Sequence, residues 1–235
     1  MTKADLRERI WDRLETEGTA RFPFPPHGRI PNFEHHREAA DRLADTEVWQ
    51  QADTLKCNPD APQLPVRRRA LRDGKTVYMA VPRLREERPF LRLAPETIED
   101  IDAATTVSGC SKHGIPVAPE ELPHIDLIVS GSVAVDDTGS RVGKGEGYSD
   151  LEFAVLEAFD RVDASTTVGT TVHDTQVVEG IETDRHDVPL ELIVTPTRTI
   201  ETESAARRPE GLYWADLDAE TIAEIPVLGR LRTDQ

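Results

Sequence analysis

The 235-residue sequence predicts an α/β fold with an open, mostly parallel sheet that carries helices on both faces. Segments with apolar residues at helical spacing alternate along the chain with short segments rich in β-branched residues. Segment 125–130, IDLIVS, is almost continuously apolar, as a strand is when helices cover both faces of its sheet. Together, these observations indicate strands that helices connect and cover.

The first half of the chain opens with an amphipathic helix at 3–17, whose apolar face holds Leu6, Ile10, Trp11 and Leu14. Four prolines in segment 21–33 exclude a helix or a central strand, so we expect a long ordered loop there. The elements expected next are a helix at 35–50, a strand at 52–57, a helix at 63–74, a strand at 75–82 and a helix at 94–104.

The second half begins with the β-rich run at 125–135, which a Ser-Gly pair interrupts. A turn at 136–140, a helix at 148–162 and strands at 166–174 and 189–197 are expected to follow it. Residues after about 201 are more polar and include prolines. We therefore expect an α/β domain over 1–200 and a C-terminal extension over 201–235 that packs on it.

The charge balance limits the classes of partner. Asp and Glu number 44 against 28 for Lys and Arg, and the net charge of −16 disfavours nucleic acid and anionic membranes. Carboxylates spread along the whole chain, with only five lysines, indicate a halophilic archaeon. Two cysteines are too few for a disulfide framework, and no apolar run approaches the ~18 residues of a membrane span. We expect a cytoplasmic protein without a membrane partner.

Three glycines alternate with charged residues in RVGKGEGYSD, residues 141–150. This run follows a strand and precedes a helix, where backbone N–H groups and the positive helix end form an anion site. Lys144 adds a point charge, Arg141 a forked donor, and Asp150 an oxygen ligand suited to Mg²⁺. Because the spacings GxxxxGK[ST] and GxGxxG are absent, a plain connection with an N-capping aspartate stays open as the alternative.

Four motifs occur in one order along the chain: KADLR, GKTVYMAVP, IDLIVSGSVAVDDTGSRVGKGEGYSD, and VGTTVHDTQVV followed by RHDVPLELIVTPT. In this order they resemble the 5-formyltetrahydrofolate cyclo-ligase family, also called the methenyltetrahydrofolate synthetases. Segments HGRIPNF, KCNPDAPQLPVR and RRPEGLYW are similar to the synthetase-domain-containing branch found in archaea and animals.

The resemblance implies a fold similar to ribose-phosphate isomerase and the CoA-transferases. It also implies an enzyme that uses ATP and Mg²⁺ to close 5-formyltetrahydrofolate, or an archaeal pterin analogue, to the 5,10-methenyl form through a phosphorylated formyl oxygen. The partner is then a small pterin or folate, with no nucleic acid, and the chain is expected to be a monomer. A non-catalytic nucleotide-binding or RNA-associated protein, or a kinase-like enzyme on another acid or amide, is the alternative.

The resemblance implies a role for each residue of this chain that stands at a position matching a motif of the family. The resemblance assigns ATP binding to Lys3, Arg7, Arg141, Gly143, Lys144, Gly145, Glu146, Gly147 and Tyr148. It makes Lys144 and Arg141 the catalytic residues and Asp150 and Asp187 the metal ligands. It places the pterin against Asp60 and Tyr148.

The sequence departs from the family pattern on the pterin side. Asp60 stands where the family usually has a glutamate, and Ser149 and Leu151 replace a usual tyrosine and arginine. The run Arg67–Arg69 is interpreted as a solvated helix face, with contact to polyglutamate, phosphate or RNA as the alternative. The pair Tyr213–Trp214 is interpreted as core packing, with stacking on a ligand ring as the alternative.

Overall fold

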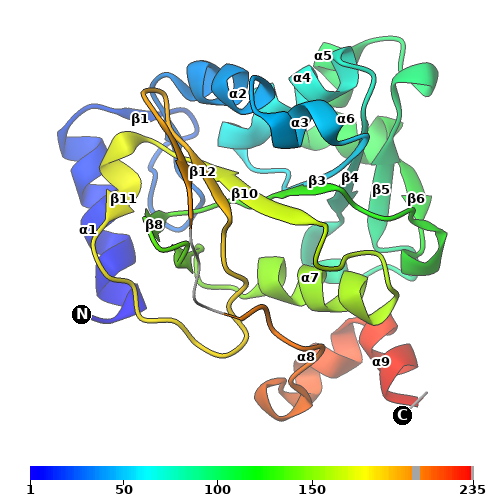
Figure 1. The fold of residues 1–235 in the computed structure, drawn as a ribbon. Helices are drawn as coiled ribbons and strands as arrows, with labels where there is room; N and C mark the ends of the chain where they lie inside the picture. Colours follow the sequence, from blue (N-terminus) through cyan, green and yellow to red (C-terminus); the bar gives the residue numbers. More distant parts are fainter. Residues whose placement is uncertain (203–206, 234–235) are drawn as a thin grey trace.

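A computed structural model of the chain describes residues 1–202 and 207–233, and its centre is an eight-stranded sheet (Figure 1). In spatial order the strands are β13 (Thr199–Glu201), β12 (Leu192–Val194), β10 (Thr167–Thr171), β7 (Leu127–Val129), β3 (Thr54–Cys57), β4 (Thr76–Ala80), β5 (Phe90–Leu93) and β6 (Ile115–Val117). The five strands from β12 to β4 are parallel, and β13, β5 and β6 add antiparallel edges. The predicted α/β fold with a mostly parallel sheet is confirmed.

Helices cover both faces of this sheet (Figure 1). One face carries α2 (His36–Ala44), α3 (Glu47–Gln51), α4 (Leu64–Arg72), α5 (Ile101–Ala104) and α6 (Val107–His113). The other face carries α7 (Tyr148–Ala158), and α8 (Ala219–Glu224) and α9 (Pro226–Thr233) lie beyond it. Two apolar cores follow, one around Trp49 and Leu55 and one around Phe153 and Leu156.

A smaller unit stands beside the main sheet. Helix α1 (Lys3–Thr16) begins at a capping box formed by Thr2 and Asp5, and it buries the predicted apolar face. It packs against β8 (Ala134–Asp136), which pairs with β9 (Arg141–Val142) and β11 (Val177–Val178) in a three-stranded sheet. The short strands β1 (Ala20–Arg21) and β2 (Asn32–Phe33) flank the proline-rich segment.

Three predicted elements were wrong in extent. The helix expected at 35–50 is two helices, because the Thr46 side chain accepts a hydrogen bond from the Trp49 amide and starts α3. The helix expected at 94–104 is reduced to a turn at Pro95–Thr97 and the short α5, since Ile98 is extended. The run at 125–135 divides into β7 and β8, which belong to different sheets. The elements that were not predicted are strands β1, β2, β5, β6, β9, β11 and β13 and helices α6, α8 and α9.

The C-terminal segment packs on the second core. Ile225, Val227 and Leu228 are buried in the same cluster as Phe153 and Leu156 of α7. The division of the chain at residue 200 stays a prediction. Within the described residues, none of the helices has both the length and the apolar character required to cross a membrane.

Candidate functional site

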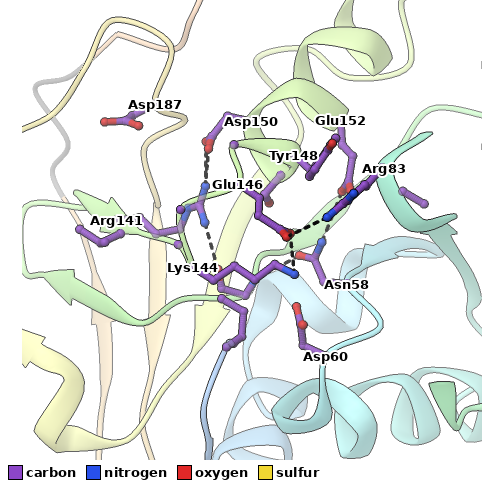
Figure 2. Close-up of a pocket in the computed structure, with 18 of the residues that line it drawn as sticks. Asn58, Asp60, Arg83, Arg141, Lys144, Glu146, Tyr148, Asp150, Glu152 and Asp187 are labelled. Carbon is purple, nitrogen blue, oxygen red and sulfur yellow. Dashed lines mark hydrogen bonds and ion pairs between the residues drawn. The ribbon is translucent and has the colours of Figure 1, made fainter. Parts of the chain in front are cut away.

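A cleft of about 510 Å³ opens at the carboxyl ends of β3, β4 and β7 (Figure 2). The chain continues from these strand ends into Asn58, Val81 and Gly131, which all line the cleft. From β3 the sheet extends to β4 on one side and, later in the chain, to β7 on the other. Such a reversal of strand order leaves a crevice outside the carboxyl ends, which is where open α/β sheets bind ligands.

All of the predicted site residues line this one cleft. They are Lys3, Arg7, Asp60, Arg141, Gly143, Lys144, Gly145, Glu146, Gly147, Tyr148, Asp150 and Asp187. The structure therefore brings together four segments that are far apart in the sequence. We call residues 141–150 with α1 the loop side of the cleft, and the residues after β3 with their contacts the strand side.

Each glycine of the loop meets a different requirement. Gly145 and Gly147 have φ values of +105° and +73°, in the region that favours glycine. A Cβ on Gly145 would lie 3.2 Å from Arg7 Cζ, and a Cβ on Gly143 would lie 3.1 Å from Arg141 Nη1. Arg7 in turn donates from Nε to the Gly143 carbonyl at 2.7 Å. The bare backbone thus lets two guanidinium groups pack directly against the loop.

The loop ends at the N-terminus of α7. Gly147 is the N-cap residue, and no side chain caps the helix there. The interpretation of an N-capping aspartate was wrong, because Asp150 lies in the first turn and binds Arg141 instead. The first turn, Tyr148 to Asp150, lines the cleft. The positive end of a helix therefore borders the cleft beside Lys144.

Arg141 and Asp150 form a nearly buried ion pair behind the loop. Arg141 Nη2 donates to both Asp150 oxygens at 2.7 and 2.8 Å, and Arg141 Nη1 donates to the Gly131 carbonyl at 2.9 Å. Asp150 also accepts from the Val188 amide at 3.1 Å. The side chains are 6% and 13% exposed, so this pair holds the loop against the end of β7.

Three cations reach the open part of the cleft. Lys144 contacts Glu146 at 2.7 Å, and Arg83 approaches the same carboxylate at 3.7 Å from the opposite wall (Figure 2). Lys3 binds both Asp184 and Asp187. Burial of Lys3 opposes its charged form, but the two carboxylates outweigh it and raise the pKa of Lys3 above its ordinary value. Five basic and six acidic side chains line the cleft of a protein whose net charge is −16.

Of the two predicted metal ligands, Asp187 is better placed to bind Mg²⁺ than Asp150. Both Asp150 oxygens already accept hydrogen bonds from Arg141. Asp187 lies in a group with Asp184 and His186, whose ligand atoms are all within 4.8 Å of one another. Because Mg²⁺ takes one or two carboxylates together with phosphates and water, this group fits the ion. Its Lys3 contact would then have to loosen.

The strand side contains polar residues that the sequence analysis missed. Lys56 of β3 is 1% exposed and forms an ion pair with Glu152 of α7. Asn58 donates to the same carboxylate at 3.3 Å and accepts from the Gly131 amide at 3.0 Å. The available signal was Lys56 itself, since a lysine inside a strand that is buried on both faces needs a charged partner.

Asp60 differs from every other acid in the cleft. No hydrogen bond to its carboxylate is present among the described residues, and Figure 2 shows it pointing toward Lys144. Burial raises the pKa of Asp60, although Lys144 and Arg67 oppose that shift. A Cβ on Gly131 would lie 2.8 Å from Asp60 Oδ2, so the carboxylate packs directly on bare backbone.

The arginine run of α4 is not a solvated face throughout. Arg67 is 1% exposed and donates to the carbonyls of Asn58 and Asp60 at 2.7 and 3.0 Å. It therefore fixes the segment that carries Asp60. The neighbouring arginines are paired with surface aspartates, namely Arg68 and Arg72 with Asp102, and Arg69 with Asp73 and Asp41.

Comparison with known proteins gives a consistent result. A family model described as the 5-formyltetrahydrofolate cyclo-ligase family matches residues 2–196. The methenyltetrahydrofolate synthase domain-containing protein of Mus musculus is 40% identical over 237 residues, covering 99% of this chain and 63% of that protein. The chain thus spans about three fifths of this relative's length. The 5-formyltetrahydrofolate cyclo-ligase of Escherichia coli K12 is 31% identical over 80 residues, covering 34% of this chain and 41% of that protein.

A solved structure supports the fold independently. The NMR structure of Aquifex aeolicus 5,10-methenyltetrahydrofolate synthetase has a TM-score of 0.57 at 18% sequence identity. The likeness covers 91% of this chain and 99% of that one. The family match ends at residue 196, so helices α8 and α9 lie beyond it.

Proposed function

The chain belongs to the 5-formyltetrahydrofolate cyclo-ligase family, and on this basis we propose that it closes 5-formyltetrahydrofolate, or a related pterin, to the 5,10-methenyl form. The proposed reaction uses ATP and Mg²⁺. The observation that carries the proposal is the cleft in which a cation-lined glycine loop faces the Asp60 carboxylate, which accepts no hydrogen bond from the described residues.

The chemistry follows from the poor leaving ability of a formamide oxygen. The formyl oxygen attacks the γ-phosphorus of ATP, the bond to the β-phosphate oxygen breaks, and ADP leaves. The electron pair of N10 then attacks the formyl carbon, N10 loses its proton, and the carbon–oxygen bond breaks. Phosphate leaves with the former formyl oxygen and takes up that proton. Such a reaction needs positioning and charge neutralisation more than covalent catalysis.

The loop side supplies what the phosphates need. Lys144 and Arg7 would neutralise phosphate oxygens over the loop, and the amide groups at the start of α7 would donate to them. Arg141 would act from behind the loop by fixing its backbone through Asp150 and Gly131. Asp187 with Asp184 would hold Mg²⁺, which when bound neutralises charge on the phosphate groups.

The strand side supplies what the pterin needs. The Asp60 carboxylate accepts no hydrogen bond from the part of the chain that the structure describes, which suits it to the N–H groups of a pterin ring. Asn58 and Glu152 form a polar wall beside it, and the ion pair with Lys56 holds Glu152 in place. Tyr148 of the loop side also lines the cleft and would contact the pterin.

The experiment follows the near-ultraviolet absorbance of the 5,10-methenyl product. Purified protein is mixed with 5-formyltetrahydrofolate, ATP and Mg²⁺ in low and in molar salt. We expect an absorbance rise that depends on ATP and is absent with ADP. No rise at any salt concentration, with ATP binding intact, would contradict cyclo-ligase activity on this folate.

A second candidate is nucleotide binding without turnover, or association with RNA. It is favoured by Asp60, which is one methylene shorter than the glutamate usual in the family. A shorter side chain displaces the carboxylate by about 1.5 Å, enough to weaken a positioned contact. ATP binding without any methenyl product would support this candidate. The kinase-like alternative requires ADP release that another acid or amide stimulates.

We also propose that the chain is a cytoplasmic monomer from a halophilic archaeon. The supporting observation is its acidic composition, with 44 Asp and Glu residues and a net charge of −16. Light scattering in molar potassium chloride tests the monomer. Unfolding measurements in low and high salt test the halophilic character, because salt should stabilise a surface that repels itself.

A further inference from the structure

A second cavity, of about 250 Å³, adjoins the cleft on the side of α7. One wall consists of Leu151 and Ala154 of α7, and the other comes from the C-terminal segment 209–221. We call it the tail pocket. It shares Glu146, Gly147, Tyr148, Asp150 and His186 with the cleft, so the two spaces meet at the end of the glycine loop and beside His186.

The segment that forms the outer wall is tied to the site. Arg185 donates to both oxygens of Asp216 at 2.9 and 2.6 Å. The same guanidinium lies 4.7 Å from the centre of the Tyr213 ring, and the Gly211 amide donates to Glu157 at 2.6 Å. Because Arg185 is two residues from Asp187, these contacts join the tail to the proposed metal-binding end of the cleft.

The residues that line the tail pocket favour one chemical class of ligand. Leucine and alanine side chains and two tyrosines, Tyr148 and Tyr213, give apolar and aromatic walls, which suit a flat uncharged heteroaromatic ring. The acidic side chains at its rim, such as Asp218, can accept from amino and hydroxyl groups. Among the described lining residues there is no lysine or arginine, so the carboxylates of a folate glutamate would be repelled rather than bound.

We propose that the tail pocket receives the base and ribose of the nucleotide whose phosphates lie on the glycine loop. This inference rests on the proposed function. The volume suits part of a ligand, since sites for whole drug-sized molecules occupy about 300–1,000 Å³. With the pterin on the strand side beside Asp60, the tail pocket is a separate space along the loop, because Asp60, Asn58 and Gly131 line the cleft and do not line the tail pocket. Its outer wall lies beyond the family match, which ends at residue 196.

Titration calorimetry with ATP and with inorganic tripolyphosphate separates the base from the phosphates. Tyr213→Ala removes an aromatic wall, and Thr221→Trp fills the pocket from the first turn of α8. Ala223→Trp adds the same ring at an exposed position of α8 as the matched control. Stacking of a base on an aromatic ring contributes enough for roughly a tenfold change in affinity.

We expect both pocket variants to weaken ATP binding by about tenfold and to leave tripolyphosphate binding within about twofold of wild type. The control should match wild type with both ligands. Equal weakening for ATP and tripolyphosphate, or no weakening for either, would overturn the assignment of the tail pocket.

The same titration separates this inference from the proposed function. Wild-type protein that binds ATP more tightly than tripolyphosphate, but forms no methenyl product, keeps the tail pocket and loses the cyclo-ligase activity. Wild-type protein that binds both ligands equally keeps the loop as a phosphate site and loses the tail pocket. Protein that binds neither ligand overturns both.

Discussion

The loop side and the strand side of the cleft satisfy their charges in opposite ways. On the loop side three of the four cleft-lining cations pair with acids: Arg141 binds Asp150, Lys144 contacts Glu146, and Lys3 binds Asp187. The fourth, Arg7, donates to the Gly143 carbonyl. On the strand side Lys56 and Glu152 satisfy each other, and the Asp60 carboxylate is left without a hydrogen bond among the described residues. The loop side is thus complete without ligand, whereas the strand side is not.

This difference in charge pairing between the two sides implies different roles in ligand binding. A polyanion on the loop competes with acids that already neutralise the cations, so its affinity reflects an exchange of partners. A half-buried carboxylate that accepts no hydrogen bond from the described residues destabilises the folded chain, and such a group persists where function needs it. We therefore expect loop substitutions to affect ATP and the Asp60 substitution to affect the pterin.

The largest effect is expected from Asp150→Ala. It leaves the nearly buried Arg141 without its partner, and an uncompensated buried charge costs about 3–5 kcal/mol of unfolding free energy. ATP use should fall by well over tenfold because the loop loses its support. Urea unfolding and kcat/KM for ATP measure both effects.

Asp102→Ala is the matched control for this prediction. Asp102 also pairs with arginine, but its side chain is 58% exposed. Its loss should cost at most about 1 kcal/mol and leave ATP use unchanged. Similar costs for the two variants would contradict a structural role for the Arg141–Asp150 pair.

The next effect is expected from Lys144→Ala. The side chain is 38% exposed and pairs only with Glu146, so stability should change by no more than about 0.5 kcal/mol. We expect kcat/KM for ATP to fall by about tenfold, or about 1.4 kcal/mol. Lys112→Ala, another exposed lysine, is the control. Unchanged nucleotide affinity in the Lys144 variant would remove the phosphate assignment of the loop.

The Asp60→Asn variant tests the strand side through the pH dependence of the unfolding free energy. Burial raises the pKa of Asp60 in the folded state above its ordinary 3.8. At pH values between 3.8 and the folded-state pKa, the folded state therefore binds more protons than the unfolded state. The stability of the wild type should therefore fall as pH rises through the folded-state pKa, and the asparagine variant should lack that loss. The variant should match the wild type near pH 3.8 and exceed it at about pH 8.

Chemical unfolding at a series of pH values measures this difference, and the KM for the pterin in the same variant should rise. A variant that is less stable than wild type at neutral pH would mean that the Asp60 carboxylate has a stabilising partner. That result would show that the strand side, like the loop side, pairs its charges without a ligand.

The smallest effect is expected from Glu146→Gln. It removes the acid that Lys144 and Arg83 share across the cleft, so tripolyphosphate should bind up to about fivefold more tightly. Titration calorimetry measures the change. Weaker binding would mean that Glu146 assists phosphate binding rather than competing with it.

Sequence patterns predicted the parts of the fold that local physics controls. Helix α1 was found because its apolar face is regular and Thr2 caps its start. Strands β5 and β6 were missed because they are short and antiparallel, and Pro116 weakens the strand signal of β6, which forms the edge of the sheet. The crossing from β7 to β8 depends on the packing of Gly131 against Asp60 and Ile30, which no local pattern contains.

The candidate site divides in the same way. Residues 141–150 were identifiable because glycines and charges alternate between a strand and a helix, and because the other motifs of the family occur in order around them. The Lys56–Glu152 pair joins a strand to a distant helix, so only the fold brings it together. Arg67 was misread because its burial depends on the Thr105 carbonyl and on the segment after β3.

The division of the cleft into a phosphate side and a pterin side is tested most directly by titrating ATP and 5-formyltetrahydrofolate separately into wild type, Lys144→Ala and Asp60→Asn. We predict that Lys144→Ala weakens ATP alone and that Asp60→Asn weakens the folate alone, each by about tenfold. Equal effects of either variant on both ligands would contradict the division.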